Sequence, residues 1–339
     1  MRIKSYRETV ESYSEEIGRD PLLVQGAGGN ASWKEDGVLW VKASGKWLQD
    51  ALVQDIFVPV DLVDMQLRLR EGDLSFSPNV IGSSTLRPSI ETLLHGLMPQ
   101  EVVLHVHAIE VLSVMVRANY DLILKECLDN LGYCWTVVSY QKPGAALASE
   151  VASAIKLCPS AEIILLANHG VVIGGASVDE VDQKLRSLCA ALTTPPLDYV
   201  YIQAPLMRNA LVNEYVQITD QSINQLAMDP RLFDRLKQDW ALYPDHVVFL
   251  GTRPFLIEAD SENFERYAKK NDFPSIIFYK GVGVFSFGEL SAAKQAQLRC
   301  YYDVLARQAP GQQLVVLSDR LVADLLNWDA EAYRQSIAK

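Results

Sequence analysis

Long apolar runs, paired cysteine motifs and a surplus of basic residues are all missing from this sequence of 339 residues. No run approaches the roughly 18 apolar residues of a membrane span, so we expect no membrane-spanning segment. The five cysteines form no C-x-x-C pair and are odd in number, which favours reduced thiols over a disulfide framework. The N-terminus has no apolar core of signal-peptide length. We therefore expect a cytoplasmic protein.

Basic residues are outnumbered by acidic ones. The chain has 31 Lys and Arg against 42 Asp and Glu, which gives a formal net charge of -11. Nucleic acids and anionic membranes attract clustered Lys and Arg, so neither is an expected partner.

Histidine is also scarce, and its placement is informative. His105 and His107 are two residues apart in an apolar, β-branched run, and side chains along a strand alternate between faces, so both point the same way. His169 follows a second apolar run, Ile163–Ala167, and precedes Gly170. Three neutral imidazoles leave a coordination position free on a divalent ion, as in a catalytic zinc site.

A simpler interpretation has to be weighed against a metal site. A histidine in an apolar strand is usually a packed core residue bonded to a backbone carbonyl, and a His-X-His motif alone does not establish a site. Glu91 and His95 favour the metal, because they are four residues apart in Pro88–Leu97. If that segment is a helix, both lie on one helical face. We predict a zinc ion, or another divalent transition metal, held by His105, His107 and His169.

Several motifs occur together in a fixed order and resemble those of the class II aldolase and adducin family. They are the Gly29-Asn30 loop, the Ser44-Gly45 turn, Ser89-Ile90-Glu91 and the three histidines. A glycine loop alone would be an ordinary turn, but the ordered set is specific. The resemblance extends from about Tyr6 to about Leu192. It implies metal ligation by the three histidines, catalysis by Glu91, and binding of an anionic substrate group by Gly29, Asn30, Ser44, Gly45 and Ser89.

The chemistry implied is reversible aldol cleavage. A metal ion chelated by a hydroxy-ketone stabilises the enediolate that remains when the carbon-carbon bond breaks, and Glu91 would carry the proton. Expected substrates are a sugar phosphate or a related hydroxy-carbonyl compound. Ile90 occupies the place of a second serine that is frequent in the family, so a sugar acid stays open. A dehydratase or epimerase would use the same enediolate, whereas a non-catalytic adducin-like module would not need the ligands.

Amphipathic segments alternate with short apolar runs in the first half of the chain. Adjacent strands joined by glycine turns indicate a mixed or antiparallel sheet, and flanking helices make this an α/β sandwich. The family resemblance implies the same fold. Expected helices are 6–17, 61–70, 88–97, 108–116, 122–131, 145–155 and 178–192, and expected strands are 38–42, 56–59, 102–107, 134–139, 163–167 and 171–173.

Thr193–Pro196 is the clearest break, because two prolines cannot continue a helix. We expect a catalytic domain over 1–195 and a smaller, metal-free α/β extension over 196–339. Residues 276–288 align without gaps on 163–175, with Val282 at the position of His169. Likewise, 247–250 resembles 102–105, with Leu250 at the position of His105. These similarities indicate a degenerate repeat, unless they reflect only a common strand-turn-strand-helix unit.

The C-terminal part also resembles extended members of the family. The segment Tyr243–Gly251 and the region near Asn327 are similar to the aldolase part of bifunctional rhamnulose-phosphate aldolase/dehydrogenases. Family members commonly assemble from several copies, so the resemblance implies a homo-oligomer. An added layer after Pro196 would pack on the catalytic domain without taking part in catalysis.

Overall fold

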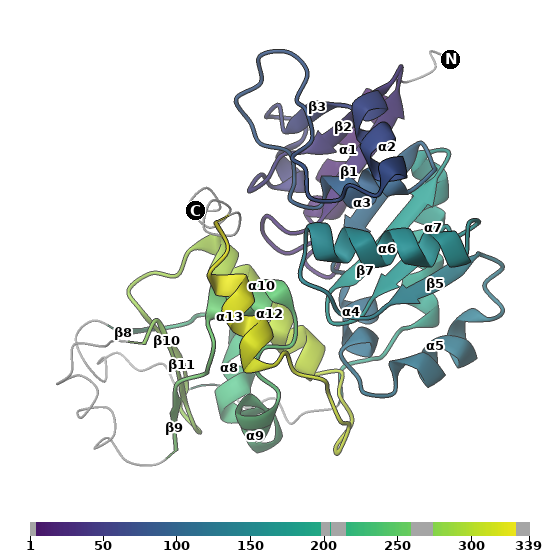
Figure 1. Ribbon diagram of the computed structural model, residues 1–339. Helices are drawn as coiled ribbons and strands as arrows, with labels where there is room; N and C mark the ends of the chain where they lie inside the picture. The colour runs from purple at the N-terminus through teal and green to yellow at the C-terminus, as the bar shows by residue number, and fades with distance from the viewer. Residues whose placement is uncertain (1–4, 198–203, 205–214, 259–273, 330–339) are drawn as a thin grey trace.

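The computed structural model describes residues 5–197, 204, 215–258 and 274–329. Two sheets organise these residues, one with seven strands and one with four (Figure 1). No helix in the described ranges is long and apolar enough to cross a membrane.

The larger sheet is formed in the N-terminal part of the chain. It has the order β3-β2-β1-β4-β7-β6-β5, and every neighbouring pair is antiparallel except β5 with β6. The expected mixed α/β sandwich is therefore confirmed. Its strands are β1 (Asn30–Glu35), β2 (Val38–Lys42), β3 (Phe57–Asp61), β4 (Val102–Val106), β5 (Trp135–Val138), β6 (Ile163–Leu166) and β7 (Gly170–Gly175).

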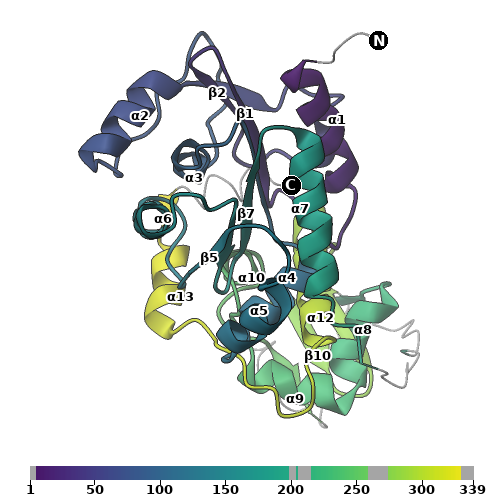
Figure 2. The same ribbon diagram turned by 90° about the vertical axis from the view of Figure 1, so that its right-hand side faces the viewer.

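Helices cover both faces of this sheet (Figure 2). Along β4, Leu104 and Val106 pack into one apolar cluster and Val103 into another, so the strand alternates between two cores. His105 therefore shares the side of Val103. The first core includes α1 (Tyr6–Gly18), α4 (Ile109–Met115), α5 (Tyr120–Leu128) and α7 (Val178–Ala191); the second includes α2 (Leu62–Glu71), α3 (Thr92–Leu97) and α6 (Ala145–Leu157).

The helix expected over Pro88–Leu97 begins only at Thr92, so that part of the sequence prediction is wrong. Ser89 donates its backbone N–H to the carbonyl of Lys42, 3.1 Å away, which ties the segment to the end of β2. Glu91 has non-helical backbone angles (φ -104°, ψ 13°). It consequently does not share a helical face with His95, whose Nδ1 lies 2.7 Å from the hydroxyl of Ser32.

The smaller sheet belongs to the C-terminal part and has the order β8-β11-β10-β9. Its hairpin and the following helix repeat the local order of β6, β7 and α7, as the sequence alignment predicted. The strands are β8 (Tyr215–Gln217), β9 (Leu256–Ile257), β10 (Ile276–Tyr279) and β11 (Gly283–Phe287); the helices are α8 (Gln221–Met228), α9 (Pro230–Gln238), α10 (Pro244–Leu250), α12 (Ala292–Leu305) and α13 (Asp319–Leu326).

The second half of the predicted repeat is wrong, because 247–250 lies in α10 and not in a strand. Pro244 occupies the first turn of this helix, where a missing N–H costs nothing, and all seven helical residues are buried. An apolar run that is buried on every side has no periodicity that distinguishes a helix from a strand. Residues 247–250 therefore resemble β4 only in amino-acid composition and not in structure.

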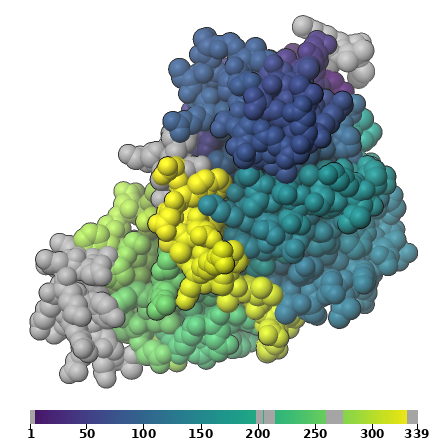
Figure 3. Space-filling view, viewed as in Figure 1, coloured from purple at the N-terminus to yellow at the C-terminus, as the bar shows by residue number. Residues whose placement is uncertain are grey.

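The two parts of the chain share a core along α4. Ile109, Leu112 and Val116 pack into the same apolar cluster as Leu298 and Tyr301 of α12. In the space-filling view, α13 lies along the line where the two parts meet (Figure 3). The boundary at 195/196 stays a prediction, but the C-terminal part packs on the N-terminal part through α4.

Candidate metal centre

Three histidines from two connected strands converge on one point. His105 lies on β4, His107 follows it, and His169 lies in the turn between β6 and β7. Their ring centroids are 5.0 to 5.2 Å apart, and one ligand nitrogen of each lies within 4.8 Å of the others. All three side chains are buried. The structure thus brings together the residues predicted as ligands.

The strand pairing explains this convergence. β4 and β7 are antiparallel, with Val106 opposite Val171, so the turn before β7 returns to the end of β4. Gly170 makes the approach possible, because a Cβ there would lie 2.5 Å from the carbonyl oxygen of Val106 and 3.0 Å from the ring of His107.

Backbone and carboxylate contacts orient two of the rings. Nδ1 of His105 lies 3.0 Å from the carbonyl oxygen of Val171, and Nδ1 of His107 lies 3.5 Å from a carboxylate oxygen of Asp245. Both partners only accept hydrogen bonds, so we place the ring proton on Nδ1 in each case. Each Nε2 is then left with a free lone pair.

The donor set fits a divalent metal ion. Burial lowers the pKa of His105 and brings that of His107 to about 3, so both rings are neutral at neutral pH. Their Nε2 atoms lie 3.2 Å apart, and two lone pairs at this distance repel unless a cation lies between them. Tetrahedral zinc with nitrogen ligands at about 2.0–2.1 Å places those nitrogens about 3.3 Å apart.

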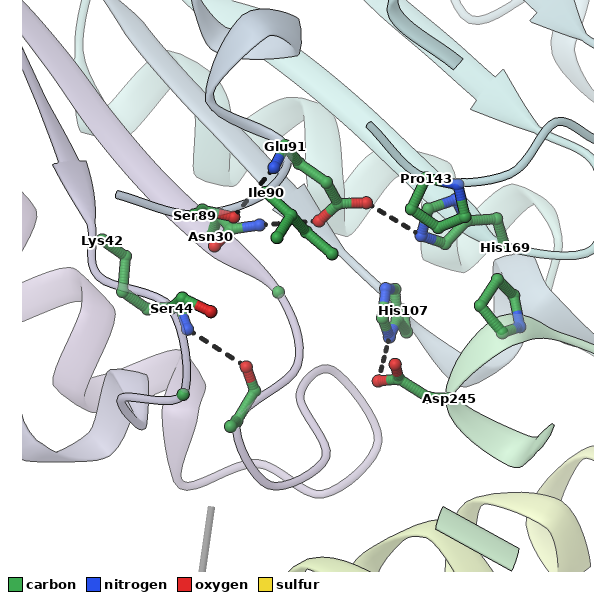
Figure 4. A pocket seen from close by; sticks show the side chains of 14 residues that line it. Asn30, Lys42, Ser44, Ser89, Ile90, Glu91, His107, Pro143, His169 and Asp245 are labelled. Carbon is green, nitrogen blue, oxygen red and sulfur yellow. Dashed lines mark hydrogen bonds and ion pairs between the residues drawn. The ribbon is translucent and has the colours of Figure 1, made fainter. Parts of the chain in front are cut away.

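Glu91 completes the centre from the segment before α3. Its Oε1 lies 3.1 Å from Nε2 of His169, and its Oε2 lies 3.4 Å from Nε2 of His105 and accepts a hydrogen bond of 2.9 Å from Asn30. Burial acts to raise the pKa of Glu91, but the neighbouring imidazoles outweigh it and hold this pKa well below its usual range. Glu91 is therefore an oriented, ionised carboxylate (Figure 4).

The family model described as the Class II Aldolase and Adducin N-terminal domain matches residues 13–192. The chain belongs to this family. A Bacillus subtilis (strain 168) protein named uncharacterized oxidoreductase YuxG is 30% identical over 188 residues, which are 51% of this chain and 27% of that protein. The chain thus spans about a quarter of the length of this relative.

Three solved structures overlap with slightly more than half of the chain. The N-terminal class II aldolase domain of a conserved protein from Thermoplasma acidophilum is 28% identical, with 57% of this chain and 94% of that chain covered and a TM-score of 0.48. A sugar-phosphate aldolase from Thermotoga maritima is 16% identical, with 55% and 91% covered and a TM-score of 0.43. An L-fuculose 1-phosphate aldolase is also 16% identical, with 57% and 85% covered and a TM-score of 0.41.

In this family member a small pocket opens beside the centre. It leaves about 20 Å³, which is room for about one water molecule, so the bulk of any substrate must reach the ligands from the open side. The hydroxyl oxygen of Ser44 is buried without a hydrogen-bond partner among the described residues. The residues predicted to bind substrate all line this pocket: Gly29, Asn30, Ser44, Gly45 and Ser89.

The glycine loop serves the metal centre as well as the pocket. Gly29 has a φ of +68°, and a Cβ there would lie 3.0 Å from the carbonyl oxygen of His105. A Cβ on Gly28 would lie 3.2 Å from Nδ1 of His107 and 3.2 Å from Oδ2 of Asp245. These glycines let the loop pack directly against the strand that carries the histidines.

Two lysines flank Ser44, and only one of them lines the pocket. Lys42 is 1% exposed, lines the pocket, and donates to the carbonyl oxygens of Ala27 and Lys46 at 3.1 and 2.6 Å. Lys46 does not line the pocket, and its ammonium group donates to Gln54.

Asp245 is the site residue that the sequence did not reveal. It comes from α10 in the C-terminal part, which was expected to take no part in the site, yet it lines the pocket together with Pro244. The only sequence signal was its place after a tyrosine and a proline at the start of an apolar run. Nothing in that run indicates proximity to His107.

Proposed function

We propose that this class II aldolase family member is a divalent-metal lyase that cleaves a hydroxy-carbonyl compound reversibly. The expected substrate is a sugar phosphate or a sugar acid, and zinc is the expected metal. One observation carries the proposal: ligand nitrogens of three buried imidazoles converge within 4.8 Å beside a carboxylate whose pKa lies well below its usual range. A structural role alone would not need a carboxylate oriented in this way.

Each protein group has a distinct role in the proposed reaction. A divalent ion, when bound, acts as a Lewis acid that draws electron density from a substrate carbonyl. Glu91 accepts a proton from the substrate at one carboxylate oxygen and returns it to carbon. Asn30 holds the other oxygen at 2.9 Å, so the carboxylate keeps its direction during the transfer.

The other end of the pocket suits an anionic substrate group. Ser44 offers a buried hydroxyl without a partner among the described residues, and the glycine loop lets a ligand approach the backbone closely. The ammonium group of Lys42 lies in the same wall. Ile90 also lines this wall, so one hydroxyl donor is missing if the group is a phosphate.

A non-catalytic interaction module is the alternative of another class. Such a module has no use for a ligand set in which neutral imidazoles and an ionised carboxylate meet in a pocket. The geometry therefore favours an enzyme.

The test is a substrate screen with the zinc-loaded protein. Phosphorylated sugars, free sugars and sugar acids are incubated with it, and released aldehyde is measured, with chelator-treated protein as the control. We expect aldehyde from at least one substrate, dependent on the metal. If the loaded protein only inverts a stereocentre or eliminates water and releases no aldehyde, the aldol-cleavage assignment is wrong and an epimerase or dehydratase replaces it.

A further inference from the structure

The C-terminal part of the chain touches both segments that carry the metal ligands, the end of β4 and the turn before β7. The first contact is between the carboxylate of Asp245 and Nδ1 of His107, at 3.5 Å (Figure 4). This distance is long for a hydrogen bond. The carboxylate nevertheless contacts the ring nitrogen of His107 that faces away from the other imidazoles. Metal binding at Nε2 would make the Nδ1–H a stronger donor and so strengthen the contact.

Asp245 is itself fixed by its surroundings. It lies in the first turn of α10 and is 2% exposed. Gln297 of α12 donates from Nε2 to the same carboxylate oxygen, 3.2 Å away. The glycine loop closes the other side, because a Cβ on Gly28 would lie 3.2 Å from that oxygen. A buried carboxylate held between a ring N–H and an amide has little freedom to turn away.

The second contact supports the turn that carries His169. Asn168, the preceding residue, has a left-handed backbone with a φ of +52°. Its side-chain amide donates to the carbonyl oxygens of Leu242 and Val315, at 2.9 and 2.7 Å. Both carbonyls belong to the C-terminal part. These two bonds hold the turn in a conformation that non-glycine residues rarely adopt.

We propose that the C-terminal part positions the metal centre through two contacts, one between Asp245 and His107 and one between Asn168 and the carbonyl oxygens of Leu242 and Val315. Asp245 keeps the proton on Nδ1 of His107, which leaves Nε2 directed at the ion, and Asn168 fixes the direction of His169. A partner of this kind typically changes metal affinity about 10- to 100-fold. The inference rests on the metal centre of the proposed function, but it does not depend on which reaction follows.

The test measures zinc affinity by competition with a chromophoric chelator, so it needs no substrate. We expect Asp245→Ala to weaken zinc binding about 10- to 100-fold and the isosteric Asp245→Asn to weaken it less. Asp234→Asn, an exposed change on α9 of the same part, is the control and should leave affinity unchanged. If Asp245→Ala does not fold, Asp245→Asn decides the question.

A second variant tests the other contact. Asn168→Gly keeps the left-handed backbone accessible but removes both amide hydrogen bonds, so a loss of zinc affinity reports on those bonds and not on strain. Wild-type zinc affinity in folded Asp245→Asn and Asn168→Gly proteins would overturn the inference. A wild-type protein that binds zinc tightly but releases no aldehyde would instead contradict the proposed reaction and leave the positioning role standing.

Discussion

The carboxylate of Glu91 lies 3.1 Å from Nε2 of His169, and the amide of Asn30 holds its second oxygen at 2.9 Å. A group in this position can transfer a proton at the edge of the metal centre, or it can bind the ion directly. The neutral amide of a glutamine keeps the size and the contact with Asn30 but cannot take up a proton. Glu91→Gln therefore separates the two roles.

We expect Glu91→Gln to lower turnover by about 100-fold or more, because a positioned acid or base contributes about that factor. Its zinc content and thermal stability should stay close to those of the wild type. Turnover is measured by aldehyde release and metal content by atomic emission. Unchanged turnover would exclude the catalytic role, and loss of zinc would make Glu91 a ligand.

The ligand assignment is tested by His107→Ala. Wild-type protein should hold about one transition-metal ion per chain, and two imidazoles are too few to retain zinc strongly at a partly open site. The variant should lose its zinc on dialysis. His95→Gln is the matched control, since His95 is buried but bonded to Ser32 outside the ligand set. Equal metal content in the His107 and His95 variants would contradict the assignment.

The sequence predicted part of this cluster because the placement of two of the histidines is local. His105 and His107 are two residues apart along one strand, so their side chains lie on the same face whatever surrounds them. His169 was recognised from its place after an apolar run, in an order typical of the family. The fold class followed in the same way from alternating helices and strands.

Long-range contacts were beyond sequence reasoning. Asp245 reaches His107 only because α10 packs beside the glycine loop, and no periodicity records that packing. The start of α3 was misplaced because a proline and a serine normally begin a helix, whereas here Ser89 bonds to Lys42 of β2 instead. Tertiary hydrogen bonds overrode the local signal in this segment.

The identity of the anionic group can be tested at Ile90, which lines the pocket between Ser89 and Glu91. If the substrate is phosphorylated, Ile90→Ser adds a hydroxyl donor, and a hydrogen bond to a charged group is worth about 1.5–3 kcal/mol. We expect KM for the phosphorylated substrate to fall about tenfold, while kcat changes little. Ile90→Ala is the control for the loss of side-chain volume. An equal effect of both variants would argue against a phosphate at this position.

The last prediction concerns His246, which lies far from water in an aromatic cage. Its ring is 4.3 Å from that of Trp240 and 4.4 Å from that of Tyr301, and neither ring nitrogen has a hydrogen-bond partner among the described residues. Burial lowers the pKa of His246 to about 3, so the folded protein keeps this ring neutral. The unfolded chain takes up the proton near pH 6.5.

Because the unfolded state then binds one more proton than the folded state, the free energy of unfolding should fall as the pH decreases from about 6.5 towards 3. The contribution of this one residue is about 1.4 kcal/mol per pH unit in that window. His246→Leu removes the titrating group and keeps an apolar side chain, so its stability should decline less steeply with acid. Urea unfolding of both proteins, with a chelator present to exclude metal effects, measures the difference between the two slopes. Since every other titrating group is shared, identical slopes would mean that His246 is charged in the folded protein.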